Sequence, residues 1–550
     1  MVAFRRVLPV LLATLCLSTL TATEDGQPAP TESISLSGLE RRLRFIAADA
    51  LEGRDPLSPG FRAAAEYLVA ELTRLGATPH GDDGTFLQRV TMRRSAIQTP
   101  TTTVEVDGEF YTHGEDLLAD GAGTAVGRVV YVGHGWRVPE RGIDPYQGLD
   151  VRGSILLALS GLPPGVTEGD LKARTRRKDY WKPLDAARDL GATGLILVPA
   201  PDELSRWTRV AERQGRGTLV VDRLAEPADL PVVTASPRLL AAVLRGQRET
   251  AERLQARAGA RDPGPSYALD PSHRVRMAVN VEVTREDTFN VVASIDGSDP
   301  AKALEYVALG AHLDHVGRLR SSGASASQGL GSSGAAAPEG EEADVINNGA
   351  DDDGSGVVAL VEIAAAVARG PRPGRSLLFV WHTGEEAGGW GARYFTAFPP
   401  VPLDRIVAQL NLDMIGRSRR PGDGRNTRLT GPDEVYLVGA HRLSRELGET
   451  IARVNRDYLN LTLNPAHDDP GDPERIYERS DHYEYAKHGI PVAFFFSGLH
   501  EDYHRPSDEV ERIDFVKLQK IARTVLASAW ALAEATDRPR RAPPVPAPRE

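Results

Sequence analysis

Three consecutive aspartates, Asp351, Asp352 and Asp353, stand between glycines directly before a segment with the pattern of a helix. Acidic side chains gathered at one point can bind metal ions, and Asp352 is our candidate for a ligand that bridges two of them. A solvated acidic loop that caps the helix is the alternative, because Asp and Gly are common in turns and caps. Other metal-binding residues elsewhere in the chain would favour the metal site over the capping loop.

A histidine and an aspartate follow the apolar segment 305–311, as His312 and Asp314. In an extended chain, residues two apart share a face, so Asp314 can accept a hydrogen bond from a ligating His312 and orient it. The neighbouring His315 would then point elsewhere. This short pattern indicates a metal site only if other ligands lie nearby.

Two adjacent carboxylates, Glu385 and Glu386, follow the apolar segment 376–382. Adjacent like charges in a partly enclosed site need compensation by cations or a raised pKa. Two metal ions would provide it, with one glutamate as a ligand and the other as a general base. An exposed acidic turn is the alternative. No histidine returns four positions after His382, so this is not the His-Glu-x-x-His helix of single-zinc peptidases.

A further carboxylate, Asp413, stands at the end of an otherwise apolar segment. Its burial would cost several kcal/mol unless the charge is paired or coordinated. A salt bridge to Arg417 is the alternative to a metal ion. Two histidines, His500 and His504, lie in the loop after the last predicted central strand, and either could be a ligand.

Alternating strands and helices are predicted from about residue 275 onward, which indicates a mainly parallel sheet with helices on both faces. Ligands of such sheets lie outside the carboxyl ends of the strands, where the residues above fall. The predicted strands are 289–296, 305–311, 376–382, 406–412, 434–439 and 490–496, and the predicted helices are 356–369, 391–398, 441–454, 480–488 and 514–535.

The N-terminal part of this fold is expected to contain two helices. Residues 36–40 begin the first, and residues 61–75 belong to the second, for which Gly76 is a plausible stop signal. The turn Ala50 to Arg54 between them suggests no chemistry by itself. Between 120 and 268 the chain instead shows short β-like segments separated by Gly and Pro, with one predicted helix at 183–190. This segment is expected to form an inserted, β-rich unit.

The N-terminus has the pattern of a secretory signal peptide, in which Arg5 and Arg6 precede an apolar run and small residues follow, so residues 1–22 are assigned to it. The mature chain would then lack cysteine, because Cys16 lies inside this segment, and metals would bind to His, Asp and Glu. No membrane span is expected after cleavage. The formal net charge of −11 argues against nucleic acid as a partner.

A chain of 550 residues exceeds one ordinary hydrophobic core, which favours two folded units. We assign 23–36 to a linker, 37–119 and 269–537 to a discontinuous catalytic domain, 120–268 to the insert and 538–550 to a disordered tail. The Ser-, Gly- and Ala-rich stretch 320–342 is expected to be a flexible insertion.

Five motifs in this order resemble the signatures of the dinuclear zinc aminopeptidase family, which includes secreted bacterial aminopeptidases, glutamate carboxypeptidases, glutaminyl cyclases and the transferrin receptor ectodomain. The resemblance spans residues 37–100 and 273–535, and the segment 120–268 resembles the protease-associated domain inserted in one branch. The motifs are His312-x-Asp314, Gly349-Ala350-Asp351-Asp352, Gly384-Glu385-Glu386, Asn411-Leu412-Asp413-Met414 and Tyr503-His504-x-Pro506-x-Asp508.

The resemblance implies a role for each residue. One zinc ion would be held by His312 and Asp413, the other by Glu386 and His504, and Asp352 would bridge both. Glu385 would be the general base, and the peptide bond between Asp352 and Asp353 would be cis. We count Asp314 among the catalytic residues because of its predicted hydrogen bond to His312. Manganese or cobalt could replace zinc, since such donor sets do not select zinc by affinity alone.

Together with the signal-peptide pattern, the resemblance implies an exported zinc aminopeptidase that removes N-terminal residues from peptides. A carboxypeptidase or another amide hydrolase on the same core is the closest alternative, and it would need a cationic clamp such as Arg417, Arg419, Arg420 or Arg505. A catalytically silent receptor module is the alternative of a different class, against which the complete ligand set and Glu385 argue.

Overall fold

The computed structural model describes residues 28–172, 174–271, 274–319, 344–420 and 428–541. The predicted signal peptide 1–22, the insertion 320–342 and the last nine residues of the predicted tail lie outside the described residues. The described residues divide into two compact units, Thr91–Asp287 and a larger one that contains residues 28–90 and the described part of 288–541. The predicted boundaries at 119/120 and 268/269 fall inside the Thr91–Asp287 unit.

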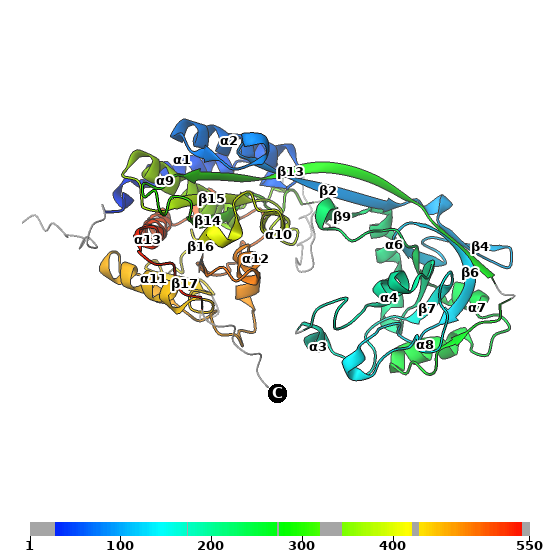
Figure 1. Ribbon diagram of the computed structural model, residues 1–550. Coiled ribbons are helices and arrows are strands. Elements are labelled where there is room, and N and C mark those ends of the chain that lie inside the picture. The colour runs from blue at the N-terminus through cyan, green and yellow to red at the C-terminus, as the bar shows by residue number, and fades with distance from the viewer. Residues whose placement is uncertain (1–27, 173, 272–273, 320–343, 421–427, 542–550) are drawn as a thin grey trace, which may run out of the picture. The chain divides into compact units, whose positions relative to one another are not determined.

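The larger unit is built on a mixed sheet in the strand order β18-β17-β19-β16-β14-β15-β13-β2, with β1 paired to β13 (Figure 1). Neighbours among β14, β15, β16 and β19 are parallel, whereas β13 and β17 are antiparallel to their neighbours β15 and β19. The strands are β1 Thr78–Pro79, β2 Leu87–Ile97, β13 Val281–Ile295, β14 Tyr306–His312, β15 Ser376–His382, β16 Ile406–Leu412, β17 Glu434–Val438, β18 Thr462–Asn464 and β19 Val492–Phe496.

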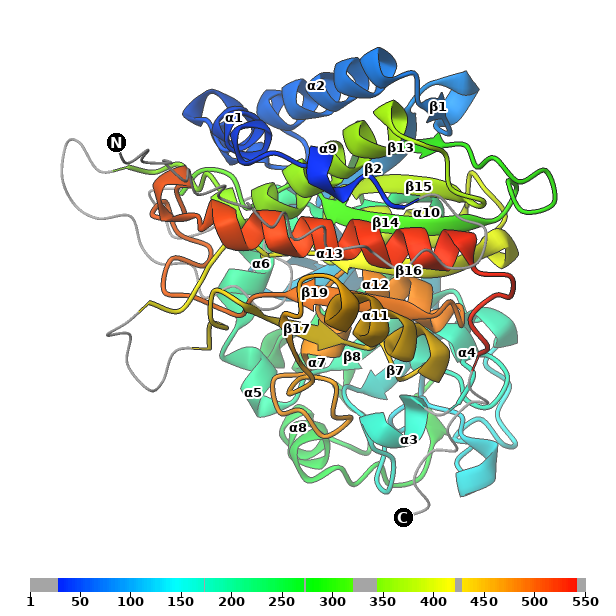
Figure 2. The ribbon, with the colours of Figure 1, turned by 90° about the vertical axis from the view of Figure 1, so that its left-hand side faces the viewer.

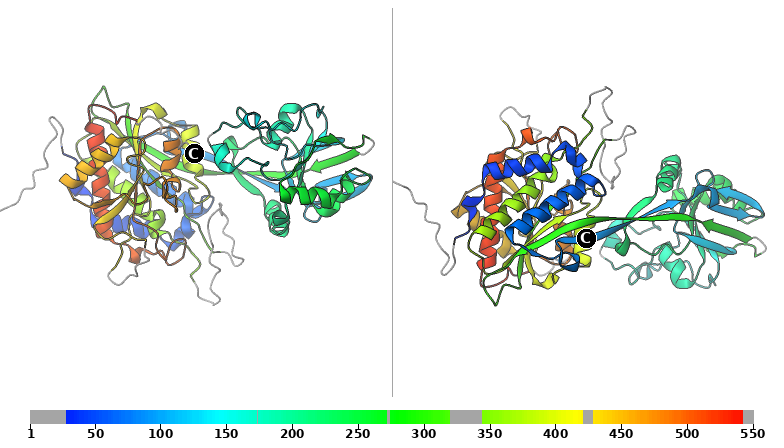
Figure 3. Two further views of the ribbon diagram at one scale, coloured as in Figure 1. Left: turned by 90° about the horizontal axis from the view of Figure 1, so that it is seen from below. Right: turned by 90° about the horizontal axis from the view of Figure 1, so that it is seen from above.

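Helices cover both faces of this sheet, so the α/β prediction is confirmed. The main core lies on the face packed by α1, α2, α9, α11 and α13, and a second cluster joins α10 and α12 to the other face. In Figure 2, α13 crosses in front of the sheet, and the right-hand view of Figure 3 shows it (red) beside α9 and the blue α1 and α2. The helices are α1 Leu36–Ile46, α2 Pro59–Leu75, α9 Gly356–Arg369, α10 Trp390–Ala397, α11 Arg445–Asp457, α12 His482–Lys487 and α13 Phe515–Glu534.

Local signals explain where these elements begin and end. Ser58 caps α2 by accepting the backbone N–H of Phe61, and Gly76 ends the helix at φ 66°, as predicted. Helix α9 is buried along Gly356–Val367, and Glu362 is the one charged side chain in that stretch, which is typical of a helix enclosed by a core. Strands β15 and β16 are buried at every position, which agrees with central strands covered on both faces.

The Thr91–Asp287 unit has a sheet of its own in the order β4-β3-β12-β6-β7-β8-β10-β5, in which β6, β7, β8 and β10 are parallel neighbours. The prediction of one helix here was incomplete, because α7 and α8 also pack apolar side chains into its core. The elements are β3 Thr103–Val106, β4 Glu109–Thr112, β5 Leu117–Asp120, β6 Gly123–Tyr131, β7 Ile155–Leu159, α3 Glu168–Lys172, α4 Pro183–Leu190, β8 Gly194–Val198, α5 Pro201–Leu204, α6 Trp207–Arg216, β9 Thr218–Val221, β10 Val232–Ala235, α7 Pro237–Val243, α8 Ala251–Ala260, β11 Tyr267–Ala268 and β12 Arg274–Val279.

Within the described residues, none of the helices has the length and apolar character needed to cross a bilayer.

Candidate metal centre and active site

The carboxyl ends of four parallel strands bring the predicted site residues to one edge of the larger unit's sheet. His312 is the last residue of β14, and Asp413 follows β16 directly. The loops after β15 and β19 carry Glu385, Glu386 and His504. Residues that are up to 192 positions apart in the printed sequence therefore meet because their strands are neighbours.

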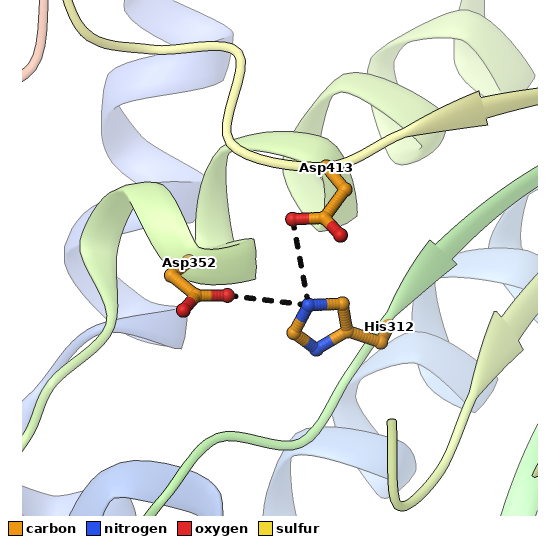
Figure 4. Close-up of side chains that lie close together, drawn as sticks. All are labelled: His312, Asp352 and Asp413. Carbon is orange, nitrogen blue, oxygen red and sulfur yellow. Dashed lines mark ion pairs between the residues drawn. The ribbon is translucent and has the colours of Figure 1, made fainter. Parts of the chain in front are cut away.

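The first cluster consists of His312, Asp352 and Asp413 (Figure 4). The Nε2 atom of His312 lies 3.2 Å from Oδ1 of Asp352 and 3.6 Å from Oδ1 of Asp413. The hydroxyl of Ser480 donates to the other carboxylate oxygen of Asp413 at 2.7 Å. All three side chains thus present one ligand atom to a common point, with Ser480 fixing the orientation of Asp413.

The second cluster shares Asp352 with the first. The Nε2 atom of His504 lies 2.9 Å from Oε2 of Glu386 and 3.2 Å from Oδ2 of Asp352. His315 lies on the other side of Glu386, with its Nδ1 atom 2.8 Å from Oε1. Asp352 therefore presents one oxygen to each cluster, as expected of a bridging carboxylate.

The electrostatics of both clusters favour a positive charge between the carboxylates. Burial lowers the pKa of His504, but Glu386 and Asp352 outweigh burial and raise that pKa to about 11. Burial also lowers the pKa of His312, and the charge of Asp413 and the hydrogen bond to Asp352 raise it well above its ordinary value. The carboxylates that raise the pKa values of these two histidines would also stabilise another cation at the same place.

Asp352 lies in the turn Ala350–Ser355, and the carboxylates of its two neighbours, Asp351 and Asp353, hold this turn in place by accepting backbone hydrogen bonds. The Asp352–Asp353 peptide bond is cis, so this expectation is confirmed. The carboxylate of Asp353 accepts the backbone N–H of His312 at 3.1 Å, of Gly356 at 3.0 Å and of Met414 at 3.2 Å. These bonds tie the turn to β14, to α9 and to the end of β16.

Asp351 and Asp508 secure the other side of the same turn. Asp351 accepts the backbone N–H of Gly416 at 2.6 Å, and its second oxygen lies 3.3 Å from His500. Asp508 accepts the backbone N–H groups of Asp351 at 3.0 Å and Asp352 at 3.2 Å. All three aspartates of the triplet are buried, so the solvated capping loop is not what forms here.

Asp314 contacts His312 differently from the sequence-based expectation. The Nδ1 atom of His312 lies 3.1 Å from the backbone oxygen of Asp314, whereas the Asp314 carboxylate is 4.0 Å away. The carboxylate instead accepts the backbone N–H groups of Glu385 at 3.1 Å and Glu386 at 3.4 Å. The chain leaves the extended conformation after His312, so side-chain alternation no longer applies to Asp314 or His315.

Glu385 lines a pocket in front of the two clusters. Removal from bulk water raises the pKa of its carboxyl group well above the ordinary value, and the negative charge of Glu386 raises it further, while His312 lowers it. The remaining wall of the pocket is largely apolar. Its lining comprises His312, Asp352, Glu385, Glu386, Asp413 and Arg479 on the polar side and Met414, Ile476, Phe494, Phe496, Leu499 and Tyr503 on the other.

Residues 290–529 match the family model described as peptidase family M28. This segment is a peptidase M28 domain. Similar proteins include a probable leucine aminopeptidase of Trichophyton verrucosum, 26% identical over 46% of this chain and 61% of that relative. A probable zinc metalloprotease of Leptosphaeria maculans is 28% identical over 35% of this chain and 50% of that protein. The chain thus spans about half to three fifths of the length of these curated relatives.

Among solved structures, the aminopeptidase from Aneurinibacillus sp. strain AM-1 is similar to this chain, with 16% identity, a TM-score of 0.45 and coverage of 94% of this chain and 98% of that one.

The donor set of the M28 domain fits divalent metal ions. Imidazole nitrogens and carboxylate oxygens are the ligands that zinc takes in catalytic sites. The ligand atoms of His312, Asp352 and Asp413 all lie within 4.8 Å of one another, as do those of His315, Asp352 and Glu386. Among the described residues, Oδ2 of Asp352 and Nε2 of His504 are buried and make no well-aligned hydrogen bond, although the two atoms lie 3.2 Å apart. Such unsatisfied buried atoms are expected where a cation belongs.

Two residues that the sequence offered as alternatives, Arg417 and His500, lie apart from the two clusters. Arg417 donates to Asp502 at 2.6 Å, so the salt bridge considered between Asp413 and Arg417 is not what the structure has. His500 contacts Asp351 and Arg417, while His504 reaches Glu386.

Sequence reasoning missed His315 in the M28 domain and was wrong to point it elsewhere. Its side chain is buried against Glu386 because the chain turns after β14. The supporting roles of Asp353 and Asp508 were missed as well. A signal for Asp508 was present, since this residue stands in the motif that contains His504.

Proposed function

We propose that this protein is an exported metallo-aminopeptidase that uses two zinc ions to remove apolar N-terminal residues from peptides. One observation carries the proposal: Asp352 presents its two oxygens to two ligand clusters, and both it and Glu385 line a pocket whose other wall is apolar. The names of the M28 relatives, among them a probable leucine aminopeptidase, support the same activity.

In this proposal His312 and Asp413 hold one zinc ion, Glu386 and His504 hold the other, and Asp352 holds both. We assign His504 rather than His315 because His504 lies within 3.2 Å of both Asp352 and Glu386, whereas His315 is 3.8 Å from Asp352. His315 then orients Glu386 through its hydrogen bond. Bound zinc would supply Lewis acidity toward the peptide carbonyl and lower the pKa of a water molecule.

Glu385 is the proposed general base. It lies in the pocket beside the clusters, and the backbone N–H of this residue is anchored on Asp314. A carboxylate with a raised pKa accepts a proton from the attacking water more readily and can then pass it to the leaving amine. The bond broken is the first peptide bond of the substrate, and Glu385 transfers one proton from the attacking water to the nitrogen of the leaving amine.

The apolar wall of the pocket would receive the N-terminal side chain of the substrate. Phe494 and Phe496 come from β19, Leu499 lies in the loop after it, and Ile476 begins the short 3-10 helix Ile476–Glu478. The carboxylates on the opposite wall would attract the free amine. This division of the pocket supports a preference for leucine-like N-terminal residues, because burial of each methylene group contributes about 0.8 kcal/mol.

A carboxypeptidase on the same core would need a cation for the substrate carboxylate. Arg417, one candidate, is already bound to Asp502. Arg479 lines the pocket and is the cation that could serve instead, so a free-carboxylate substrate is the second candidate.

The Thr91–Asp287 unit is proposed to be a protease-associated domain. The resemblance of segment 120–268 and the mixed sheet of this unit support that assignment. Export is proposed on the signal-peptide pattern of residues 1–22.

Two measurements test the function. Metal analysis of the purified protein should find about two zinc ions per chain, and well under one, with no activity restored by zinc, manganese or cobalt, would favour a binding role instead. Turnover of leucine arylamide should then be compared with that of an N-acylated dipeptide that has a free carboxylate. Turnover of the blocked dipeptide alone would exclude the aminopeptidase.

A further inference from the structure

Arg54 is a fully buried arginine whose side chain donates hydrogen bonds to four backbone carbonyl groups. It lies outside the segment matched by the M28 model, in the turn Asp49–Arg54 between α1 and α2. Its guanidinium donates to backbone oxygens at 2.6 to 3.0 Å, those of Ile46, Leu313, Asn348 and Gly349. Three separate segments of the chain are therefore joined at one side chain.

Two of these segments carry the proposed metal ligands. Leu313 directly follows His312, and Gly349 stands three residues before Asp352. The Nε atom of Arg54 bonds the first of these loops, and Nη1 and Nη2 bond the second. The rigid, planar guanidinium thus sets the distance between the two loops.

Backbone hydrogen bonds of the same turn strengthen this link. The N–H of His315 donates to the oxygen of Arg54 at 3.1 Å, and the N–H of Gly317 donates to the oxygen of Gly53 at 3.1 Å. The N–H of Asn347 in turn donates to the oxygen of Gly317 at 3.1 Å. The turn therefore acts as a clasp between the loop after β14 and the loop before Asp352.

The clasp requires an unusual backbone that leaves no room for a side chain at its centre. Glu52, Gly53 and Arg54 have φ angles of 51°, 69° and 50°, in the left-handed region that non-glycine residues seldom adopt. A Cβ atom on Gly53 would lie 2.5 Å from the oxygen of Asn347 and 2.8 Å from that of Gly317. A conformation this unfavourable persists only where surrounding contacts enforce it.

We propose that Arg54 is a positioning residue that fixes the separation of His312 and Asp352, and thereby sets the affinity of the metal centre. The inference rests on the proposed metal site. Lysine cannot replace Arg54, because its three donors radiate from one nitrogen and cannot reach carbonyls spread around a planar fork.

The first test compares Arg54→Lys with a matched control, Arg375→Lys. Arg375 is also buried and bonds the backbone oxygens of Leu532 and Ala535 at the end of α13, away from the proposed ligands. Zinc affinity is measured by competition with a chelator, and the absorption spectrum of the cobalt-loaded protein reports ligand geometry. We expect Arg54→Lys to bind zinc about 10- to 100-fold more weakly, with an altered cobalt spectrum. Arg375→Lys should match the wild type in both.

The second test keeps the guanidinium and disturbs the clasp through Gly53→Ala, in case Arg54→Lys fails to fold. Its control is Gly76→Ala, where φ is also left-handed, at 66°, but no heavy atom of the described residues lies within 4 Å of the added Cβ. Only Gly53→Ala should weaken zinc binding and change the cobalt spectrum. Zinc affinities equal to the control in both tests would overturn the role of Arg54, whereas a wild type that binds no zinc would overturn the proposed function itself.

Discussion

The carboxylate of Asp314 accepts the backbone N–H of Glu385 at 3.1 Å, and that of Glu386 at 3.4 Å. The same residue offers its backbone oxygen to Nδ1 of His312 at 3.1 Å. Asp314 therefore connects a proposed ligand of one zinc ion to the proposed general base and to a ligand of the other. Its side chain holds the backbone of Glu385 and Glu386, and its backbone oxygen holds the ring of His312.

Asp314→Asn should lower kcat about 10- to 100-fold at saturating zinc, the range found when a partner of a metal ligand is lost. The asparagine oxygen can still accept one N–H, but its NH2 group repels the other, so the turn at Glu385 shifts. KM for leucine arylamide should change little, because the apolar wall remains intact. Asp296→Asn, an exposed acid at the end of β13, is the control. An unchanged kcat for Asp314→Asn would contradict the anchoring role.

Glu385→Gln and Asp352→Asn should separate proton transfer from metal binding. Glutamine removes the general base and should reduce kcat about 100- to 10,000-fold while the metal content stays at the wild-type level. Asparagine at 352 weakens the donor shared by both clusters and should reduce the metal content as well. Equal metal content in the two variants would show that Asp352 is not the bridge.

His504→Ala and His315→Ala should differ in how much zinc they retain. His504 lies within 3.2 Å of both Glu386 and Asp352, so its loss should remove one of the two ions. His315 contacts Glu386 most closely, at 2.8 Å, so its loss should weaken binding of that ion about 10- to 100-fold and leave the stoichiometry at saturation unchanged. Metal analysis after equilibration at high and low free zinc distinguishes the two. Loss of the ion in both variants would make His315 a ligand.

The sequence was informative wherever hydrophobic periodicity decides the structure. The predicted spans of α9, β15 and β16 agree with the observed elements at both ends. Because the strands were placed well, the residues that follow them could be assigned to one edge of the sheet. The type of side chain at each strand end then indicated the chemistry.

Conformations of the connecting loops could not be predicted in the same way. His315 turns toward Glu386 only because the chain bends after β14, and the three left-handed residues of the turn at Arg54 have no periodic signal. The role of Arg54 depends on carbonyl groups nearly 300 positions away, on Asn348 and Gly349. Such contacts follow from the assembled fold, since local sequence does not specify which backbone groups meet across it.

A buried histidine outside the proposed ligand set should make the protein sensitive to acid. His482 in α12 packs against the ring of Phe494, with centroids 4.6 Å apart, and burial lowers the pKa of His482 from 6.5 to about 3. Between these pH values the unfolded chain binds a proton that the folded protein refuses. Stability is therefore fully present above pH 6.5 and falls by about 1.4 kcal/mol for each unit of pH below it.

His482→Phe should remove this contribution, since phenylalanine does not titrate. Urea unfolding at pH 6.5 and pH 5, at equal metal loading, should show that the wild type loses about 2 kcal/mol more than the variant over this range. His441→Phe, at an exposed position before α11, is the control for the replacement of a histidine by phenylalanine. If His482→Phe keeps the wild-type slope, His482 takes up its proton in the folded state, and the acid sensitivity must come from other groups.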